Sequence, residues 1–202
     1  MLRNDGVLIL SHKRADNITT ISTLRRDGWT GPIKIVVSSD EPELEKYKAR
    51  FGDDVIVFDK ADAMSETDAM TSSPRADCVV YARNQCWKIA DELGWEYFIE
   101  LDDDYDSFML REPVGRVLKG IEVKDLDGIF AAMEEFVDVS WAKAVCMSQR
   151  GDFIGGASGN NAHRLVSRKM MNVYVCRSDR PFKFGGEMLS HVLISANMAI
   201  YV

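Results

Sequence analysis

The chain has 202 residues, of which 46% are hydrophobic and 28% are charged, and its formal net charge at pH 7 is −7. This balance excludes a disordered or fibrous protein, and the negative charge argues against one that coats nucleic acid along its whole surface. No apolar run approaches the ~20 residues of a membrane-spanning helix, and the first residues lack the apolar stretch of a secretory signal, so we expect a cytoplasmic protein without membrane contact.

Short apolar runs alternate with helical patterns over the first sixty residues. Three runs predict buried strands: Gly6–Leu10, Ile33–Val37 and Val55–Phe58. A helix capped by Asp16 or Asn17 is expected after the first run, and a charged helix beginning at Glu41–Pro42 after the second. This β-α-β-α-β order predicts a parallel, doubly wound sheet.

The middle of the chain adds another helix and strand. Residues 59–74 are polar without a steady period, which predicts a long loop on the ligand side. Beyond Asp77, whose residue type predicts a helix cap, apolar residues recur at helical spacing until Gly94. The apolar run Tyr97–Leu101 then predicts a fourth strand, whose carboxyl end is where open α/β sheets bind ligands.

The regular alternation ends after this strand. Residues 108–119 alternate like a hairpin, 126–137 have an amphipathic helical pattern, and 144–147 and 171–176 predict strands around the glycine-rich segment 151–161. We expect a single domain over residues 1–202. The apolar residues 189–202 resemble a helix leading into an unfinished strand, so a domain that continues past Val202 stays an open alternative.

Three adjacent carboxylates, Asp102, Asp103 and Asp104, follow the fourth predicted strand directly. They would repel one another unless a divalent cation or several hydrogen-bond donors compensated their charge. Asp102 and Asp104 could hold one Mg²⁺ or Mn²⁺ from a turn, leaving other positions to waters and a diphosphate. The alternative is a solvated acidic turn. A metal here would offset the charge that builds on a leaving diphosphate.

Further polar side chains follow the other predicted strands. Ser11, His12 and Arg14 follow the first strand and Asp40 the second, so they should stand on the same rim of the sheet as the acidic cluster. Arg83 and Asn84 lie early on the helix before the fourth strand, where a guanidinium can pair with phosphate. Strand-end hydrogen bonding and an exposed helical pair are the alternatives.

Glu187 follows Phe184, Gly185 and Gly186, whose glycines allow a tight turn that would bring a carboxylate toward an acceptor. A general base is one interpretation of this residue. The other is a glutamate in the first turn of a helix, where it would complement the helix dipole.

The motifs Ile9–Arg14, Ser38–Asp40, Ala82–Asn84 and Phe98–Tyr105, in this order, resemble the GT-A glycosyltransferases over most of the chain. The segment Arg180–Glu187 and the Asp-Asp-Asp-Tyr sequence are similar, more narrowly, to the phage-type TET-associated glycosyltransferases of hydroxymethylated DNA. The resemblance implies a mixed, mostly parallel sheet flanked by helices.

The same resemblance implies roles for individual residues. Asp102 to Asp104 would be the metal-binding acidic motif. Asp102 and Asp103 would also contact the donor, a nucleotide sugar in which UDP carries the sugar. A second set would bind the nucleotide: Ser11, His12, Arg14, Asp40, Arg83 and Asn84. Glu187 matches the acidic residue near the acceptor, although Met188 replaces the Asp that often follows it in this family.

The resemblance further implies transfer of a hexose or N-acetylhexosamine to a 5-hydroxymethylpyrimidine in DNA, in the host cytoplasm if the protein is phage-encoded. Duplex DNA would require base flipping, with residues 151–161, Arg164, Arg168 and Lys169 as contacts. Three alternatives remain: transfer to a glycan, lipid or protein; nucleotidyl transfer, which normally shows a glycine-rich loop after the first strand that Ser11–Arg14 lacks; and a non-catalytic nucleotide-sugar-binding module.

Overall fold

The computed structural model describes residues 4–148, 170 and 172–186. Its elements in chain order are β1 (Asp5–Leu10), α1 (Thr19–Arg26), β2 (Ile33–Ser38), α2 (Leu44–Phe51), the 3₁₀ turn η1 (Gly52–Asp54), β3 (Val55–Phe58), α3 (Lys60–Glu66), α4 (Val80–Glu92), β4 (Tyr97–Asp102), β5 (Met109–Val114), β6 (Val117–Glu122), α5 (Leu126–Ser140), β7 (Ala144–Met147) and β8 (Asn172–Arg177). Among these residues, no helix combines the length and the apolar character needed to cross a bilayer.

The central sheet has six strands in the order β3-β2-β1-β4-β8-β7. The first four are parallel to one another, and the connections β1–β2, β2–β3 and β3–β4 each contain a helix. Strand β8 runs antiparallel to both β4 and β7. This mixed, mostly parallel sheet flanked by helices confirms the expected fold class. The chain leaves β1 toward β2 on one side and reaches β4 on the other, so the carboxyl ends of β1 and β4 form a topological switch point.

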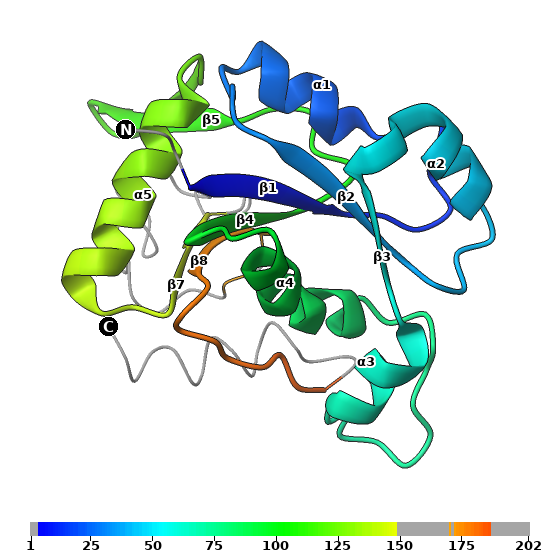
Figure 1. Cartoon of the computed structure of the whole chain (residues 1–202). Helices are drawn as coiled ribbons and strands as arrows, with labels where there is room; N and C mark the ends of the chain where they lie inside the picture. Colours follow the sequence, from blue (N-terminus) through cyan, green and yellow to red (C-terminus); the bar gives the residue numbers. More distant parts are fainter. Residues whose placement is uncertain (1–3, 149–169, 171, 187–202) are drawn as a thin grey trace.

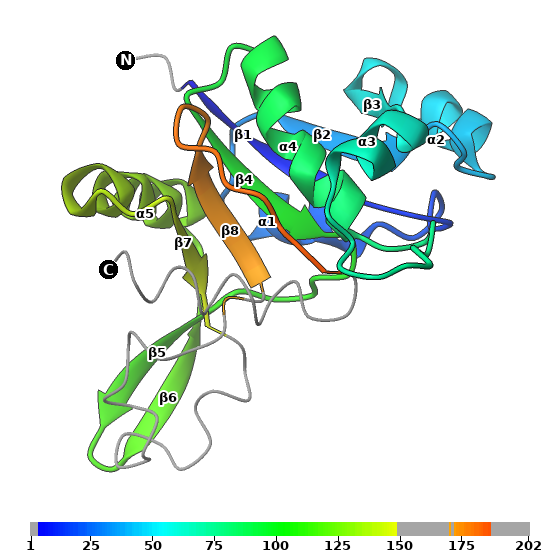
Figure 2. The same ribbon diagram turned by 90° about the horizontal axis from the view of Figure 1, so that it is seen from below.

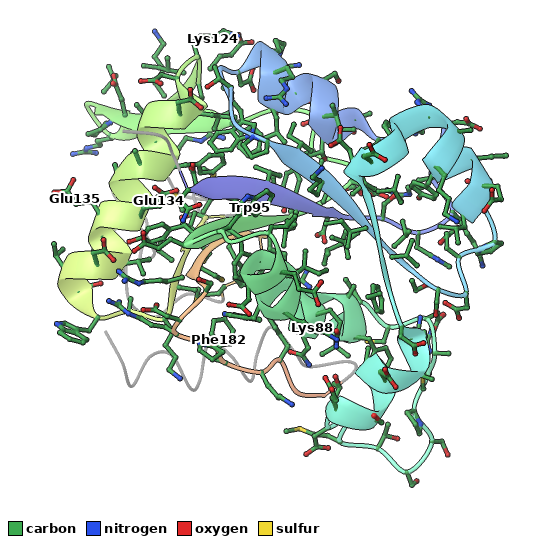
Figure 3. The ribbon with its side chains drawn as sticks, viewed as in Figure 1. Lys88, Trp95, Lys124, Glu134, Glu135 and Phe182 are labelled. Carbon is green, nitrogen blue, oxygen red and sulfur yellow. The ribbon has the colours of Figure 1, made fainter. Side chains whose placement is uncertain are left out.

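Helices cover both faces of the sheet, so the molecule has three layers (Figure 1). One face packs against α1, α2 and α5, with Leu24, Tyr47 and Phe130 fully buried. The other packs against α3, α4 and the segment after β8. Phe182 of that segment contacts Trp87 of α4, with ring centroids 4.6 Å apart, and Trp95 lies beside the sheet at the end of the α4–β4 connection (Figure 3). These two apolar layers explain why β1 is buried along its whole length.

Strands β5 and β6 form a separate hairpin that projects away from the sheet (Figure 2). Its base is held by the buried Asp27, whose Oδ2 accepts a hydrogen bond from Phe108 N and whose backbone oxygen accepts one from Leu126 N. The guanidinium of Arg26 is the main reason that the pKa of Asp27 is lowered. The predicted hairpin is therefore confirmed, with its first strand starting one residue later than the sequence pattern suggested.

Several boundaries differ from the sequence predictions. Residues 59–74 are not all loop, because Asp59 caps the helix α3 by accepting a hydrogen bond from Asp62 N. Neither Asp16 nor Asn17 caps α1, whose Thr20 N donates instead to the backbone oxygen of Asp103. Likewise, α2 begins at Leu44 rather than at Glu41, and Asp77 pairs with Arg75 rather than capping α4. These contacts join residues far apart in the sequence or replace a local cap by another partner.

Candidate functional site

A cavity of about 320 Å³ opens at the carboxyl ends of the parallel strands, where the topology places a ligand site. It combines the turn after β1, the ends of β2 and β3, the start of α4 and the acidic triplet after β4. Six of the predicted site residues line it: Ser11, His12, Arg14, Asp102, Asp103 and Asp104. The fold therefore brings together side chains from positions more than ninety residues apart.

Asp103 is the buried member of the triplet. Its Oδ2 accepts a hydrogen bond from Ser11 Oγ at 2.6 Å, and its Oδ1 accepts one from Arg14 Nη1 at 2.8 Å. Since the Ser11 hydroxyl donates to Asp103, the hydroxyl of Tyr47, 2.7 Å away, must donate to Ser11 and accept from Arg14 N. A directed chain of hydrogen bonds thus runs from the backbone at Arg14 through Tyr47 and Ser11 to Asp103. Burial is the main reason that the pKa of Tyr47 is raised.

Asp102 and Asp104 are more exposed than Asp103. The side chain of Asp104 is 66% exposed and accepts a hydrogen bond from Arg14 Nη1 at 3.2 Å. The side chain of Asp102 is 41% exposed and lies 3.3 Å from Arg83 Nη2. Partial burial raises the pKa of Asp102, Arg83 lowers it, and the neighbouring Asp104 and Asp103 raise it further. All three carboxylates therefore line the cavity, and Asp103 is the one whose two oxygens are held by Ser11 and Arg14.

The backbone of the triplet is fixed by the start of α1. Thr20 is fully buried, and its hydroxyl donates to the backbone oxygen of Asp102 and accepts from Tyr105 N. Its backbone nitrogen donates to the backbone oxygen of Asp103. The turn that carries the carboxylates is thus held on both sides of Asp103 by one threonine, which sequence analysis did not single out.

The carboxylates suit a hard divalent cation, because Mg²⁺ and Mn²⁺ prefer oxygen ligands. Asp102 and Asp104 supply two such ligands on one wall of the cavity. Within residues 4–148, 170 and 172–186, no group of three or more His, Cys, Asp or Glu side chains is arranged to hold a metal ion. Two carboxylates fit a cation whose remaining positions are filled by water and a bound ligand.

Arg83 and Asn84 were expected to bind the nucleotide, but they are not among the residues that line the cavity. Arg83 is buried between Glu100 and Asp102, with its Nε 3.4 Å from Glu100 Oε1, and it stacks on the rings of Tyr174 and Phe184. Burial lowers the pKa of Arg83, but the two carboxylates raise it by more, so that it is raised overall. In turn, burial raises the pKa of Glu100 to about 7 although Arg83 lowers it. Arg83 thus reaches the site through Asp102.

Asn84 has a structural contact in place of the predicted ligand contact. Its side chain accepts a hydrogen bond from Phe184 N and donates to Phe184 O, at 2.8 and 2.9 Å, and it also donates to Thr67 Oγ1. These bonds tie α4 to the segment after β8 and to the end of α3. An asparagine whose amide is satisfied in this way holds the fold beside the site.

Asp40 stands just outside the cavity lining. Its carboxylate accepts a hydrogen bond from Ser38, which is the main reason that its pKa is lowered, and it lies 3.8 Å from Lys60 Nζ. Ser38 and Lys60 both line the cavity. Asp40 therefore places the ammonium group of Lys60, a cation that sequence analysis missed because its helix lay in the segment predicted as loop.

His12 has a buried partner that sequence analysis also missed. Its Nδ1 lies 2.6 Å from Oε2 of Glu41, whose side chain is fully buried, while the side chain of His12 is 47% exposed. The sequence could have indicated this pair, because His12 and Glu41 lie in the turns that follow β1 and β2, and adjacent parallel strands bring such turns side by side.

The remaining predictions lie outside the described residues. These are Glu187, the segment 151–161, and the basic residues Arg164, Arg168 and Lys169. The segment before Glu187 is described up to Gly186, whose backbone nitrogen donates to Asp68 O.

Comparison with known proteins gives a family and a set of remote structures. The sequence profile described as TET-Associated Glycosyltransferase matches residues 6–195. Among solved structures, glucosyl-3-phosphoglycerate synthase from Mycobacterium tuberculosis with Mg²⁺ and uridine diphosphate has 13% identity and a TM-score of 0.46, over 96% of this chain and 64% of that one. Its complex with Mn²⁺, uridine diphosphate and phosphoglyceric acid has 14% identity and a TM-score of 0.44, over 96% and 63%. The chain thus spans less than two thirds of those proteins' length. No curated protein matches it.

Proposed function

Because the chain belongs to the TET-associated glycosyltransferase family, we propose that it is a metal-dependent glycosyltransferase that uses a nucleotide sugar, with UDP as the nucleotide. It transfers a hexose or N-acetylhexosamine to the hydroxyl of a 5-hydroxymethylpyrimidine in DNA. The observation that carries the proposal is the arrangement of the triplet in the cavity, where Asp102 and Asp104 are the more exposed carboxylates and Asp103 is fixed by Ser11 and Arg14. The acceptor rests on the resemblance of Arg180–Glu187 and the Asp-Asp-Asp-Tyr sequence to enzymes that modify hydroxymethylated DNA.

The two ends of the cavity would bind different parts of the donor, the diphosphate at one end and the nucleoside at the other. Asp102 and Asp104 would hold Mg²⁺ or Mn²⁺, which supplies a positive charge against the leaving diphosphate. Arg14, already between two carboxylates, would extend its remaining donors to the phosphates. At the other end, Ser38 and Lys60 lie where a nucleoside would continue from the diphosphate. Glu187 would act near the acceptor as the base that removes the proton of the attacking hydroxyl.

A nucleoside assay by mass spectrometry tests the proposed reaction. The protein, Mn²⁺ and a panel of UDP-sugars are incubated with DNA containing 5-hydroxymethylcytosine or 5-hydroxymethyluracil. The DNA is then digested to nucleosides, and their masses are measured. We expect a mass gain of one hexose or N-acetylhexosamine. Metal-dependent hydrolysis of a UDP-sugar without this gain would reject the DNA acceptor and keep the donor. The absence of both the mass gain and the hydrolysis would reject the transferase and favour a binding module.

The role of the acidic triplet predicts a loss of function without a loss of stability. Asp104→Ala should abolish metal-dependent binding of UDP-sugar, because it removes one of the two proposed metal ligands, while the melting temperature changes little at this exposed position. Calorimetric titration with and without Mn²⁺ measures the binding. Asp106→Ala, two residues along and also exposed, is the matched control and should bind like the wild type. Unchanged affinity in Asp104→Ala would remove the central claim.

A further inference from the structure

The pair formed by His12 and Glu41 joins the cavity to a buried carboxylate. His12 lines the cavity, and its Nδ1 lies 2.6 Å from Oε2 of Glu41. The two residues belong to the turns after β1 and β2, which are adjacent parallel strands. One ring nitrogen is therefore occupied inside the protein, and the other, Nε2, lies on the side of the ring away from Glu41.

The orientation of the Glu41 carboxylate is fixed by backbone donors. Its Oε1 accepts hydrogen bonds from Glu43 N at 3.0 Å and from Lys13 N at 3.2 Å, and its Oε2 accepts a longer one from the same Lys13 N at 3.3 Å. Lys13 has a φ of 55°, in the left-handed region that non-glycine residues rarely adopt. The carboxylate thus stabilises the unusual turn mainly through Oε1, while its Oε2 makes its shortest contact with the ring of His12.

This geometry selects one form of the imidazole. A carboxylate only accepts hydrogen bonds, so Nδ1 must carry the hydrogen. In a neutral ring, Nε2 is then left with a lone pair and acts as an acceptor, whereas a free histidine in water prefers the hydrogen on Nε2. Phosphate oxygens are acceptors too, so a neutral ring in this form cannot bind them; it can bind an O–H or N–H group.

We propose that Glu41 is a positioning residue that holds His12 with its hydrogen on Nδ1, so that Nε2 accepts a hydrogen bond from the nucleoside part of the donor. The group that it accepts from is a ribose hydroxyl or a base N–H. The phosphates are left to Arg14 and the metal end of the cavity, which offer positive charge. This inference rests on the proposed use of a nucleotide donor, but the form of the ring can be measured without any ligand.

The test is ¹⁵N NMR of the histidine side chains at about pH 8.5, well above the ordinary imidazole pKa. The wild type should show His12 with its hydrogen on Nδ1. In Glu41→Gln, the amide oxygen is expected to keep the two backbone donors at the Oε1 position, which places the NH₂ group against Nδ1. The hydrogen of His12 should then move to Nε2 while the melting temperature changes little. A purely structural role for Glu41 would not move this signal.

The ligand side of the inference uses uridine diphosphate and uridine as probes. Uridine diphosphate should shift the Nε2 resonance of the wild type, and uridine at high concentration should cause the same shift. Glu41→Gln should weaken the binding of uridine diphosphate about tenfold, because Nε2 becomes a donor facing another donor. Glu43→Gln is the matched control, since Glu43 accepts from Ala15 N and does not contact His12. It should retain both the ring form and the affinity.

The outcomes separate this inference from the proposed function. A wild-type ring with its hydrogen on Nε2, or a ring that keeps its Nδ1 hydrogen in Glu41→Gln, would overturn the role of Glu41. Tight binding of uridine diphosphate that leaves the Nε2 resonance unmoved would overturn the nucleoside contact. A ring with its hydrogen on Nδ1 in a protein that binds no uridine nucleotide would contradict the proposed donor and the contact, and would leave the positioning by Glu41 established.

Discussion

Two side-chain networks hold the acidic triplet from opposite sides, and they differ in burial. On the β1 side, Arg14 has a side chain that is 47% exposed and binds Asp103 and Asp104. On the α4 side, the side chain of Arg83 is 3% exposed and binds Glu100 and Asp102. An exposed ion pair contributes little to stability, whereas a buried charge that loses its partner is costly. The first network should therefore matter to the ligand and the second to the fold.

The largest expected effect tests the buried side of this comparison. Arg83→Leu should lower the free energy of unfolding by roughly 3–5 kcal/mol at neutral pH, because it leaves Glu100 buried without a cation. Urea denaturation followed by circular dichroism measures the change. The double variant Arg83→Leu/Glu100→Leu should recover much of the loss, since two apolar side chains need no mutual charge. A single variant that loses no more than ~1 kcal/mol, the value of an exposed ion pair, would contradict the argument.

The next effect is a dependence of stability on pH that Glu100 produces. Burial raises its pKa to about 7 in the folded protein, above the unfolded value of 4.5. Between about pH 4.5 and 7 the folded state therefore binds more protons than the unfolded state, and the free energy of unfolding falls as pH rises, by on the order of 3 kcal/mol. Denaturation at several pH values from 5 to 8 should show this fall. Glu100→Gln should flatten it, and an equal slope in the variant would assign the effect elsewhere.

A smaller effect probes the half-buried network. Tyr47→Phe removes the hydroxyl that accepts from Arg14 N and donates to Ser11 Oγ, but keeps the buried ring. We expect a loss of roughly 1–2 kcal/mol in the free energy of unfolding, the cost of leaving one donor without an acceptor. Donor binding should also weaken, since Ser11 then holds Asp103 less firmly. Ser22→Ala, on the exposed face of α1, is a control for loss of a hydroxyl. A Tyr47→Phe variant as stable as this control would break the proposed chain.

The comparison also explains what sequence analysis could predict. Apolar runs gave the strands because strands buried on both faces need uninterrupted apolar residues, and the parallel order then placed Ser11, Arg14 and the triplet on one rim. The partners Glu41 and Tyr47 were missed because they lie in a charge-rich segment without any local mark of burial. Arg83 was assigned to the ligand, yet Glu100, a carboxylate within an apolar strand, was the signal that a buried cation had to lie beside it.

The smallest expected change in stability belongs to Arg14, and it should accompany a large change in affinity. Arg14→Gln should alter the free energy of unfolding by less than about 1 kcal/mol, because the guanidinium is half exposed and Asp103 keeps its bond to Ser11. Binding of UDP-sugar with Mn²⁺ should weaken roughly tenfold or more, the value of one charge-assisted hydrogen bond to phosphate. Arg116→Gln, at an exposed position in the turn between β5 and β6, controls for the lost charge. If Arg14→Gln destabilised the protein as much as Arg83→Leu, exposure would not separate the two networks, and the division between ligand and fold would fail.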